Sequence, residues 1–99
     1  MEFVGPLASG FTIYSKSGCI NCSRVKKLLE ENRVTSDIID CDDYIVEDKP
    51  RFLLFINKLA GVNIKTFPIV FNNGTFVGSY DETKDYVDKI NCFDTNLNF

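Results

Sequence analysis

The 99-residue chain predicts an α/β fold with the element order β-α-β-α-β-β-α and one four-stranded mixed sheet flanked by helices. Short runs rich in β-branched and aromatic residues alternate with segments of helical periodicity. The first two predicted strands are joined through a helix, and a right-handed crossover makes such strands parallel. An Asn-Gly turn joins the last two strands, which makes them an antiparallel hairpin.

The first half of the chain supplies the parallel pair. Residues 11–14 are typical of a strand, and residues 23–32 are typical of a helix with Val25, Leu28 and Leu29 on one face. Residues 37–40 form a second short β-like run. The acidic stretch 40–48 is expected to be mostly loop, with its last residues available to begin the next helix.

The second half supplies two helices and the hairpin. A helix is predicted over residues 48–60, because Pro50 suits a first helical turn and Gly61 suits the position just after a helix end. Its apolar positions at helical spacing are Phe52, Phe55, Ile56 and Leu59. The hairpin strands cover residues 69–71 and 75–77, and a last amphipathic helix covers residues 81–90. The core-facing positions of that helix are Tyr86, Val87 and Ile90.

Composition limits the classes of function. With 44% hydrophobic residues the chain can form a single domain over residues 1–99, with a core at about 11–91 and loosely structured extensions at 1–10 and 93–99. The longest apolar stretch, residues 52–56, is far below the ~20 residues that span a bilayer. No charge run suggests a nucleic-acid tail, and no secretory signal is seen. We therefore expect a cytoplasmic monomer that binds neither membrane nor nucleic acid.

A Cys-x-x-Cys pair, Cys19 and Cys22, lies between the first strand and the first helix. A two-residue gap lets both sulfurs meet, and the amides and partial positive charge of a helix start stabilise a thiolate at the first cysteine. Such a turn exposes the first thiol and covers the second, so one attacks and the other resolves. The residues that add positive charge around the pair are Lys16, Arg24, Lys26 and Lys27.

Two alternatives to a redox centre are a zinc site and a structural disulfide. A closed zinc site needs four ligands, yet the chain has no His, and its other cysteines, Cys41 and Cys92, stand alone. A structural disulfide framework is unusual in a chain without a secretory signal. A redox centre is therefore favoured. Cys41 and Cys92 are interpreted as buried small hydrophobes, with a regulatory or dimer-forming disulfide through Cys92 as a minority alternative.

Four motifs in order and spacing carry a resemblance to a known family. They are Lys16 to Cys22, Thr66-Phe67-Pro68, the Asn73-Gly74 turn, and Gly78 to Glu82. Over residues 11–91 the chain resembles a dithiol glutaredoxin, which implies a thioredoxin-like fold of the glutaredoxin type. Thioredoxin itself fits less well, because no Trp precedes Cys19 and the residues between the cysteines are not Gly-Pro.

The resemblance implies an enzyme that reduces protein disulfides and glutathione mixed disulfides, with glutathione as reductant and co-substrate. Cys19 would be the nucleophile and Cys22 the resolving thiol. Lys16 would pair with the glycine carboxylate of glutathione, although a solvated surface lysine is the commoner role of this residue type. The implied protein partners are disulfide-containing or glutathionylated proteins, with ribonucleotide reductase as one candidate.

The remaining implied roles also concern glutathione. Phe67 would offer its backbone N–H and C=O to the cysteine portion, as an added strand does. Pro68 would be the family's cis-proline, against the plainer reading of a proline that starts a strand. Thr66 would line the same groove, with Lys65 and Arg51 as less secure additions. Asp81 and Glu82 would hold the γ-glutamyl end at a helix start, although Asp81 could simply be a helix N-cap.

The chain departs from the family between its cysteines, where Ile20 and Asn21 replace the usual proline and tyrosine. Members of the family without that proline more often share a [2Fe–2S] cluster between two subunits, with glutathione as co-ligand. A cluster-binding or redox-sensing module is therefore one alternative function. A redox-inert interaction domain on the same fold is another. Neither a structural metal nor a cluster is part of the expected site.

Overall fold

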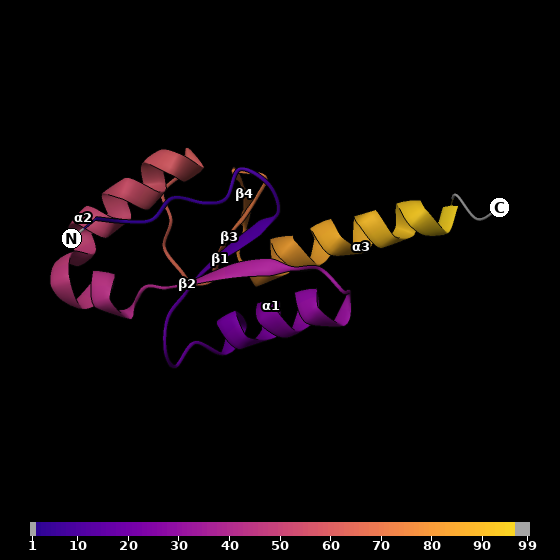
Figure 1. Cartoon of the computed structure of the whole chain (residues 1–99), viewed down its shortest axis with the longest axis horizontal. Coiled ribbons are helices and arrows are strands. Elements are labelled where there is room, and N and C mark those ends of the chain that lie inside the picture. Colours follow the sequence, from indigo (N-terminus) through magenta and orange to yellow (C-terminus); the bar gives the residue numbers. More distant parts are fainter. Residues whose placement is uncertain (1, 97–99) are drawn as a thin grey trace.

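A computed structural model describes residues 2–96 of the chain, with the side chains of residues 2–90. Its centre is a mixed sheet in the order β2-β1-β3-β4 (Figure 1). The first strand, β1, pairs in parallel with β2 and antiparallel with β3, which in turn pairs antiparallel with β4. The strands are β1 (Phe11–Ser15), β2 (Ser36–Asp40), β3 (Ile69–Asn72) and β4 (Thr75–Gly78). The predicted fold class is confirmed.

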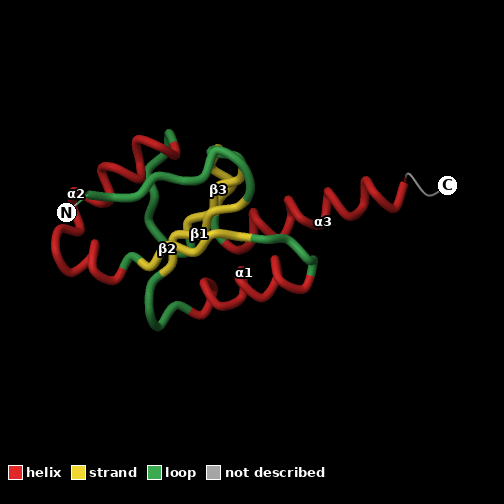
Figure 2. The backbone as a smooth tube through the Cα atoms, viewed as in Figure 1, coloured by secondary structure: helices red, strands yellow, loops and turns green. Residues whose placement is uncertain are grey.

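Three helices cover the two faces of this sheet. They are α1 (Ile20–Glu31), α2 (Asp42–Ala60) and α3 (Tyr80–Asn96). The first and third pack on one face, and α2 packs on the other (Figures 1 and 2). The first helix begins three residues before its predicted start, because Cys19 acts as its N-cap and brings the turn containing Cys22 into the helix.

Side chains alternate between the two faces of β1, and this alternation produces two cores. The cluster under α1 and α3 contains Phe11, Ile13, Val25, Leu29, Val70 and Val87. The cluster under α2 contains Tyr14, Cys41, Phe52, Ile56, Ile69 and Phe71. Cys41 is a free, fully buried thiol, as interpreted from the sequence. The side chain of Cys92 lies outside the described residues.

The acidic stretch predicted as loop is helical from Asp42 onward. Tyr44 and Ile45 pack against the α2-side core, and Asp42 and Asp43 suit the partial positive charge of a helix start. Helical geometry breaks only at Asp48. The Asp48 carboxylate accepts the backbone N–H of Arg51 at 3.1 Å and so starts the second segment, with Pro50 in its first turn. This segment ends at Gly61, whose φ of 74° is left-handed, as predicted.

The last helix is longer and less buried than predicted. Of its three predicted core positions only Val87 is buried, whereas Tyr86 is 37% exposed and Ile90 is 45% exposed. The helix runs past the end of the sheet toward the C-terminus (Figure 1), so its last turns extend beyond the strands. Helical periodicity alone could not reveal where the sheet stops.

The segment before β1 is held against the α2 side of the molecule, although the sequence suggested a loose extension. The ring of Phe3 lies 5.0 Å from that of Tyr44, 5.5 Å from that of Phe52 and 5.3 Å from that of Phe55. The carbonyl of Val4 accepts the Tyr14 hydroxyl at 2.7 Å. We call residues 2–10 the N-terminal strap.

The hairpin and the turn after it depend on residues with positive φ. Asn73 and Gly74 have φ of 54° and 78°, the pair of values that a type I′ turn requires. Gly78 has φ of 141°, and a Cβ added there would lie 2.5 Å from Cβ of Glu82. Glycine at position 78 therefore allows α3 to begin directly beside the end of β4.

Candidate active site

The two cysteines lie at the start of α1, where the chain leaves the carboxyl end of β1. Cys19 is extended, with φ of −98° and ψ of 109°, and its Sγ accepts the backbone N–H of Cys22 at 3.1 Å. The backbone N–H of Cys22 and the positive end of the helix thus both face the Cys19 sulfur. Cys19 is partly exposed, whereas Cys22 is 1% exposed. The sequence predicted this division between an accessible and a covered thiol.

Cys22 has the environment of a thiol that stays protonated until it is needed. Burial raises the pKa of the Cys22 thiol, and interaction with the Cys19 side chain raises it further. The nearby backbone of Lys16 and the hydroxyl of Ser15 oppose this rise. The net rise favours the protonated form of the Cys22 thiol.

The loop that leads into Cys19 is anchored to α2. The Asp42 carboxylate accepts the backbone N–H of Ser17 at 2.8 Å and also accepts the Ser17 hydroxyl. These hydrogen bonds lower the pKa of the Asp42 carboxyl, with a smaller contribution from Lys16. No local pattern predicts this link, because the two residues are 25 positions apart.

A groove of about 600 Å³ opens beside Cys19. Lys16 and Gly18 contribute from the cysteine loop, and Thr66 and Phe67 from the segment before β3. The Phe67–Pro68 peptide bond is cis, as the resemblance implied. The Phe67 ring stacks on Phe52 with an interplanar angle of 9°, and the Lys16 ammonium lies 5.6 Å from the centre of the Phe67 ring. Packing and a cation–π contact thus hold both walls of the groove.

A second hollow of about 200 Å³ adjoins this groove and runs to the start of α3. The residues that line both are Ile64, Lys65 and Thr66. Pro68, Gly78, Ser79 and Glu82 line only the second. The two hollows together connect Cys19 with the first turn of α3.

The N-cap of α3 lies two residues earlier than the sequence suggested. Ser79, not Asp81, precedes the helix, and its backbone N–H is accepted by the Glu82 carboxylate at 2.8 Å. This is half of a capping box, so Glu82 has a structural role in addition to the one expected of it. Asp81 is exposed in the first turn and lines neither hollow.

The positive charge at the groove comes partly from residues other than those predicted. Lys16 and Lys65 line it, as expected, but the third cation is Lys49 of α2. Arg51 instead places its guanidinium 5.6 Å from the Phe3 ring, and Arg24 lies over Tyr80. Lys49 lies within the helix predicted over residues 48–60, but its position at the groove depends on how α2 packs beside the cysteine loop, which helical periodicity does not reveal.

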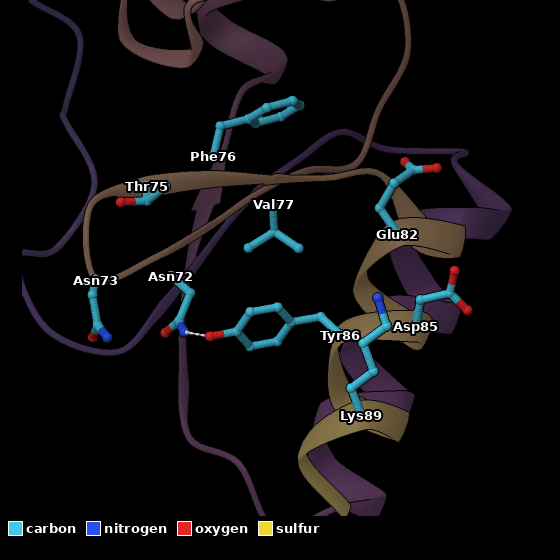
Figure 3. Close-up of a pocket in the computed structure, with 9 residues that line it drawn as sticks. All are labelled: Asn72, Asn73, Thr75, Phe76, Val77, Glu82, Asp85, Tyr86 and Lys89. Atoms are coloured by element: carbon cyan, nitrogen blue, oxygen red, sulfur yellow. Dashed lines mark hydrogen bonds between the residues drawn. The ribbon is translucent and has the colours of Figure 1, made fainter. Parts of the chain in front are cut away.

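Another pocket, of about 570 Å³, lies between the hairpin and the outer face of α3 (Figure 3). Asp85, Tyr86 and Lys89 line it from successive turns of α3, and Asn72 donates to the Tyr86 hydroxyl at 2.7 Å. It contains no cysteine and is separate from the groove that holds Cys19.

No group of three or more His, Cys, Asp and Glu side chains arranged for a metal ion occurs among the residues that the structure describes. Within residues 2–96 no helix combines the length and apolarity needed to cross a membrane.

The fold and the Cys-x-x-Cys turn place the protein in the thioredoxin-like class. The glutaredoxin family model matches residues 11–77, about two thirds of the chain, and the protein belongs to the glutaredoxin family.

Known relatives agree with this assignment. Mitochondrial glutaredoxin-2 of Rattus norvegicus is 34% identical over 71 residues, which cover 72% of this chain and 43% of the relative, so the chain spans under half of that protein's length. Glutaredoxin 1 of Francisella tularensis, solved with cacodylate, superimposes with a TM-score of 0.71 at 30% identity and covers 81% of this chain and 93% of that one. A buckwheat glutaredoxin, solved as a glutathione complex, gives a TM-score of 0.63 at 28% identity, covering 76% and 64%.

Proposed function

We propose that this protein is a glutathione-dependent oxidoreductase that reduces protein disulfides and glutathione mixed disulfides. The observation that carries the proposal is the position of Cys19, partly exposed, hydrogen-bonded at its sulfur and facing a groove with three lysines. The glutathione complex of the buckwheat relative supports the choice of co-substrate.

Glutathione is a tripeptide with two carboxylates, and the connected hollows suit its length. Lys16 binds the glycine carboxylate, and the backbone of Phe67 pairs with the cysteine portion beside Thr66 and the cis-proline Pro68. The γ-glutamyl end reaches the amides at the start of α3, near Asp81 and Glu82. Glu82 already caps the helix through the backbone N–H of Ser79. It therefore contributes to glutathione binding by fixing the amides that contact the γ-glutamyl end.

With a glutathionylated protein, the Cys19 thiolate attacks the glutathione sulfur. A Cys19–glutathione disulfide forms, the original disulfide breaks, and the protein leaves as a thiolate that takes a proton from water. A second glutathione thiolate then attacks the bound glutathione sulfur, which releases oxidised glutathione and restores the Cys19 thiolate. Two glutathione-derived electrons have reduced one disulfide.

With an internal protein disulfide, Cys19 forms a mixed disulfide with the protein and Cys22 resolves it. Cys22 must first lose its proton, because its raised pKa favours the protonated thiol. After attack by Cys22 the second protein thiol is released and a Cys19–Cys22 disulfide remains. Two glutathione molecules reduce that disulfide.

Mass spectrometry of the Cys22→Ser variant tests the co-substrate. Mixed with oxidised glutathione, it should gain one glutathione, on Cys19, and lose it again when reduced glutathione is added. Lys16→Gln should lower the equilibrium constant of this adduct about tenfold, because a charge-assisted hydrogen bond is removed. Lys58→Gln, at an exposed lysine of α2 that does not line the groove, is the matched control. An adduct that is absent, or equally stable in both lysine variants, would refute the proposed glutathione site.

A further inference from the structure

The segment that carries Phe67 and Pro68 past Cys19 is supported from behind by an aromatic ring of α2. Phe67 lines the groove, and its own ring is partly buried. That ring stacks on Phe52 with the two centroids 6.2 Å apart and an interplanar angle of 9°. Phe52 is fully buried. The place of the Phe67–Pro68 turn relative to Cys19 thus depends on the place of the Phe52 ring.

Phe52 also contacts the N-terminal strap, which begins beside α2 (Figure 1). The ring of Phe3 meets the Phe52 ring edge-on, with the centroids 5.5 Å apart and an interplanar angle of 74°. Phe3 is itself held by the rings of Tyr44 and Phe55 and by the guanidinium of Arg51. It is therefore a fixed neighbour of Phe52 and not a side chain that rests loosely on the surface.

The strap backbone is fixed directly after Phe3. The Tyr14 hydroxyl donates to the carbonyl of Val4 at 2.7 Å, and the backbone N–H of Val4 donates to the Tyr44 hydroxyl at 3.3 Å. We call the rings of Phe3, Phe52 and Phe67 the aromatic row. This row connects the strap, at one end, with the wall of the groove at the other.

We propose that Phe3 is a positioning residue, which through the aromatic row holds the Phe67–Pro68 turn where the glutathione portion of a disulfide substrate binds. The inference rests on the proposed function and adds to it a residue outside the groove. Because protein interiors are close-packed, removal of the Phe3 ring leaves space beside Phe52 and lets Phe52 and Phe67 shift. Phe3 does not line the groove, so the reactivity of the Cys19 thiol should not depend on it.

Two rates test the proposal, measured under conditions in which circular dichroism shows every variant to be folded. The first is kcat/KM for the glutathione mixed disulfide of 2-mercaptoethanol, a substrate that is held by its glutathione portion. The second is the rate constant for alkylation of Cys19 by iodoacetamide, which has no such portion, followed by mass spectrometry of the peptide that contains Cys19. Phe3→Ala should lower kcat/KM about fivefold, mainly through a higher KM, and should leave the alkylation rate unchanged.

Two further variants separate positioning from a general loss of stability. Phe3→Tyr keeps the ring and should retain most of the wild-type kcat/KM. Val34→Ala is the matched control, because Val34 is also partly buried but packs against the core under α1 and α3. It should lower the stability of the domain and leave kcat/KM unchanged.

An unchanged kcat/KM in Phe3→Ala would overturn the positioning role alone. So would an equal fall in Val34→Ala or Phe3→Tyr, or an equal fall in the alkylation rate of Phe3→Ala. Failure of the wild-type protein to reduce the mixed disulfide, with Cys19 still open to alkylation, would instead overturn the proposed function and this inference with it.

Discussion

The carboxylate of Asp42 holds Ser17, two residues before the nucleophilic cysteine, through the backbone N–H at 2.8 Å and through the hydroxyl. Position 42 is the first residue of α2, so this contact ties the cysteine loop to the helix that forms the opposite wall of the groove. Gly18, with φ of 73°, lies between Ser17 and Cys19. The position of the thiol in the groove thus depends on a contact made outside the groove.

Asp42→Ala is expected to lower kcat/KM for a glutathione mixed disulfide about three- to tenfold, because the loop carrying Lys16 and Cys19 loses its anchor. Asp42→Asn should recover part of the loss, since its amide oxygen can still accept one hydrogen bond. Asp43→Ala, an exposed neighbour in the same helical turn, is the control and should behave as wild type. Equal activities in all three variants would show that the loop holds its position without Asp42.

Phe3 is expected to stabilise the domain although it lies outside the predicted core. Its ring contacts three aromatic rings of α2, and Arg51 lies over it. Phe3→Ala should lower the free energy of unfolding by about 1–3 kcal/mol, below the range for a fully buried Phe. Val4→Ala, at a side chain that is 54% exposed, should cost less than about 0.5 kcal/mol. Urea unfolding measures both, and equal stabilities would mean that the strap is not part of the folded unit.

The domain should lose stability in alkaline solution through its buried thiol. Burial raises the pKa of Cys41 to about 12, against about 8.5 for an unfolded thiol. Between these values the unfolded chain has released the proton and the folded chain has kept it, so the free energy of unfolding falls as pH rises. The loss is about 1.4 kcal/mol per pH unit for one proton. Burial also raises the pKa of Tyr14 above its usual range and adds to the effect at higher pH.

Urea unfolding under reducing conditions, from pH 7.5 to 10.5, should show this fall in the wild-type protein. Cys41→Ala and Cys41→Ser, which both remove the titrating thiol but pack differently, should each be less stable at pH 7.5 and lose less stability per pH unit. A pH dependence that neither variant changes would assign the effect to other groups.

Local signals in the sequence predicted most of the fold and the chemical centre of the site. The Cys-x-x-Cys turn, the Asn-Gly hairpin and the glycine after α2 each depend on a few adjacent residues whose conformational preferences are strong. The cis-proline was instead implied by the family resemblance. The parallel pairing of β1 with β2 and the antiparallel pairing of β3 with β4 followed from the crossover and the hairpin, whereas the pairing of β1 with β3 was not predicted.

What the sequence did not reveal depends on contacts between distant segments. The acidic stretch 40–48 was predicted to be mostly loop, yet it is helical from Asp42 onward, where Tyr44 and Ile45 pack against the α2-side core. The strap is held by rings that only the folded α2 assembles, and Ile90 is exposed because α3 outruns the sheet. None of these effects has a local sequence pattern from which it could be predicted.

Steady-state reduction of the glutathione mixed disulfide of 2-mercaptoethanol tests the central claim most directly, with wild type, Cys19→Ser and Cys22→Ser compared at neutral pH. Among the cysteines that the structure describes, Cys19 is the one with a partly exposed, hydrogen-bonded sulfur, so Cys22→Ser should retain activity and Cys19→Ser should fall to the uncatalysed rate. Substantial activity in Cys19→Ser, or its complete loss in Cys22→Ser, would contradict the assignment of Cys19 as the nucleophile of a glutathione-dependent reaction.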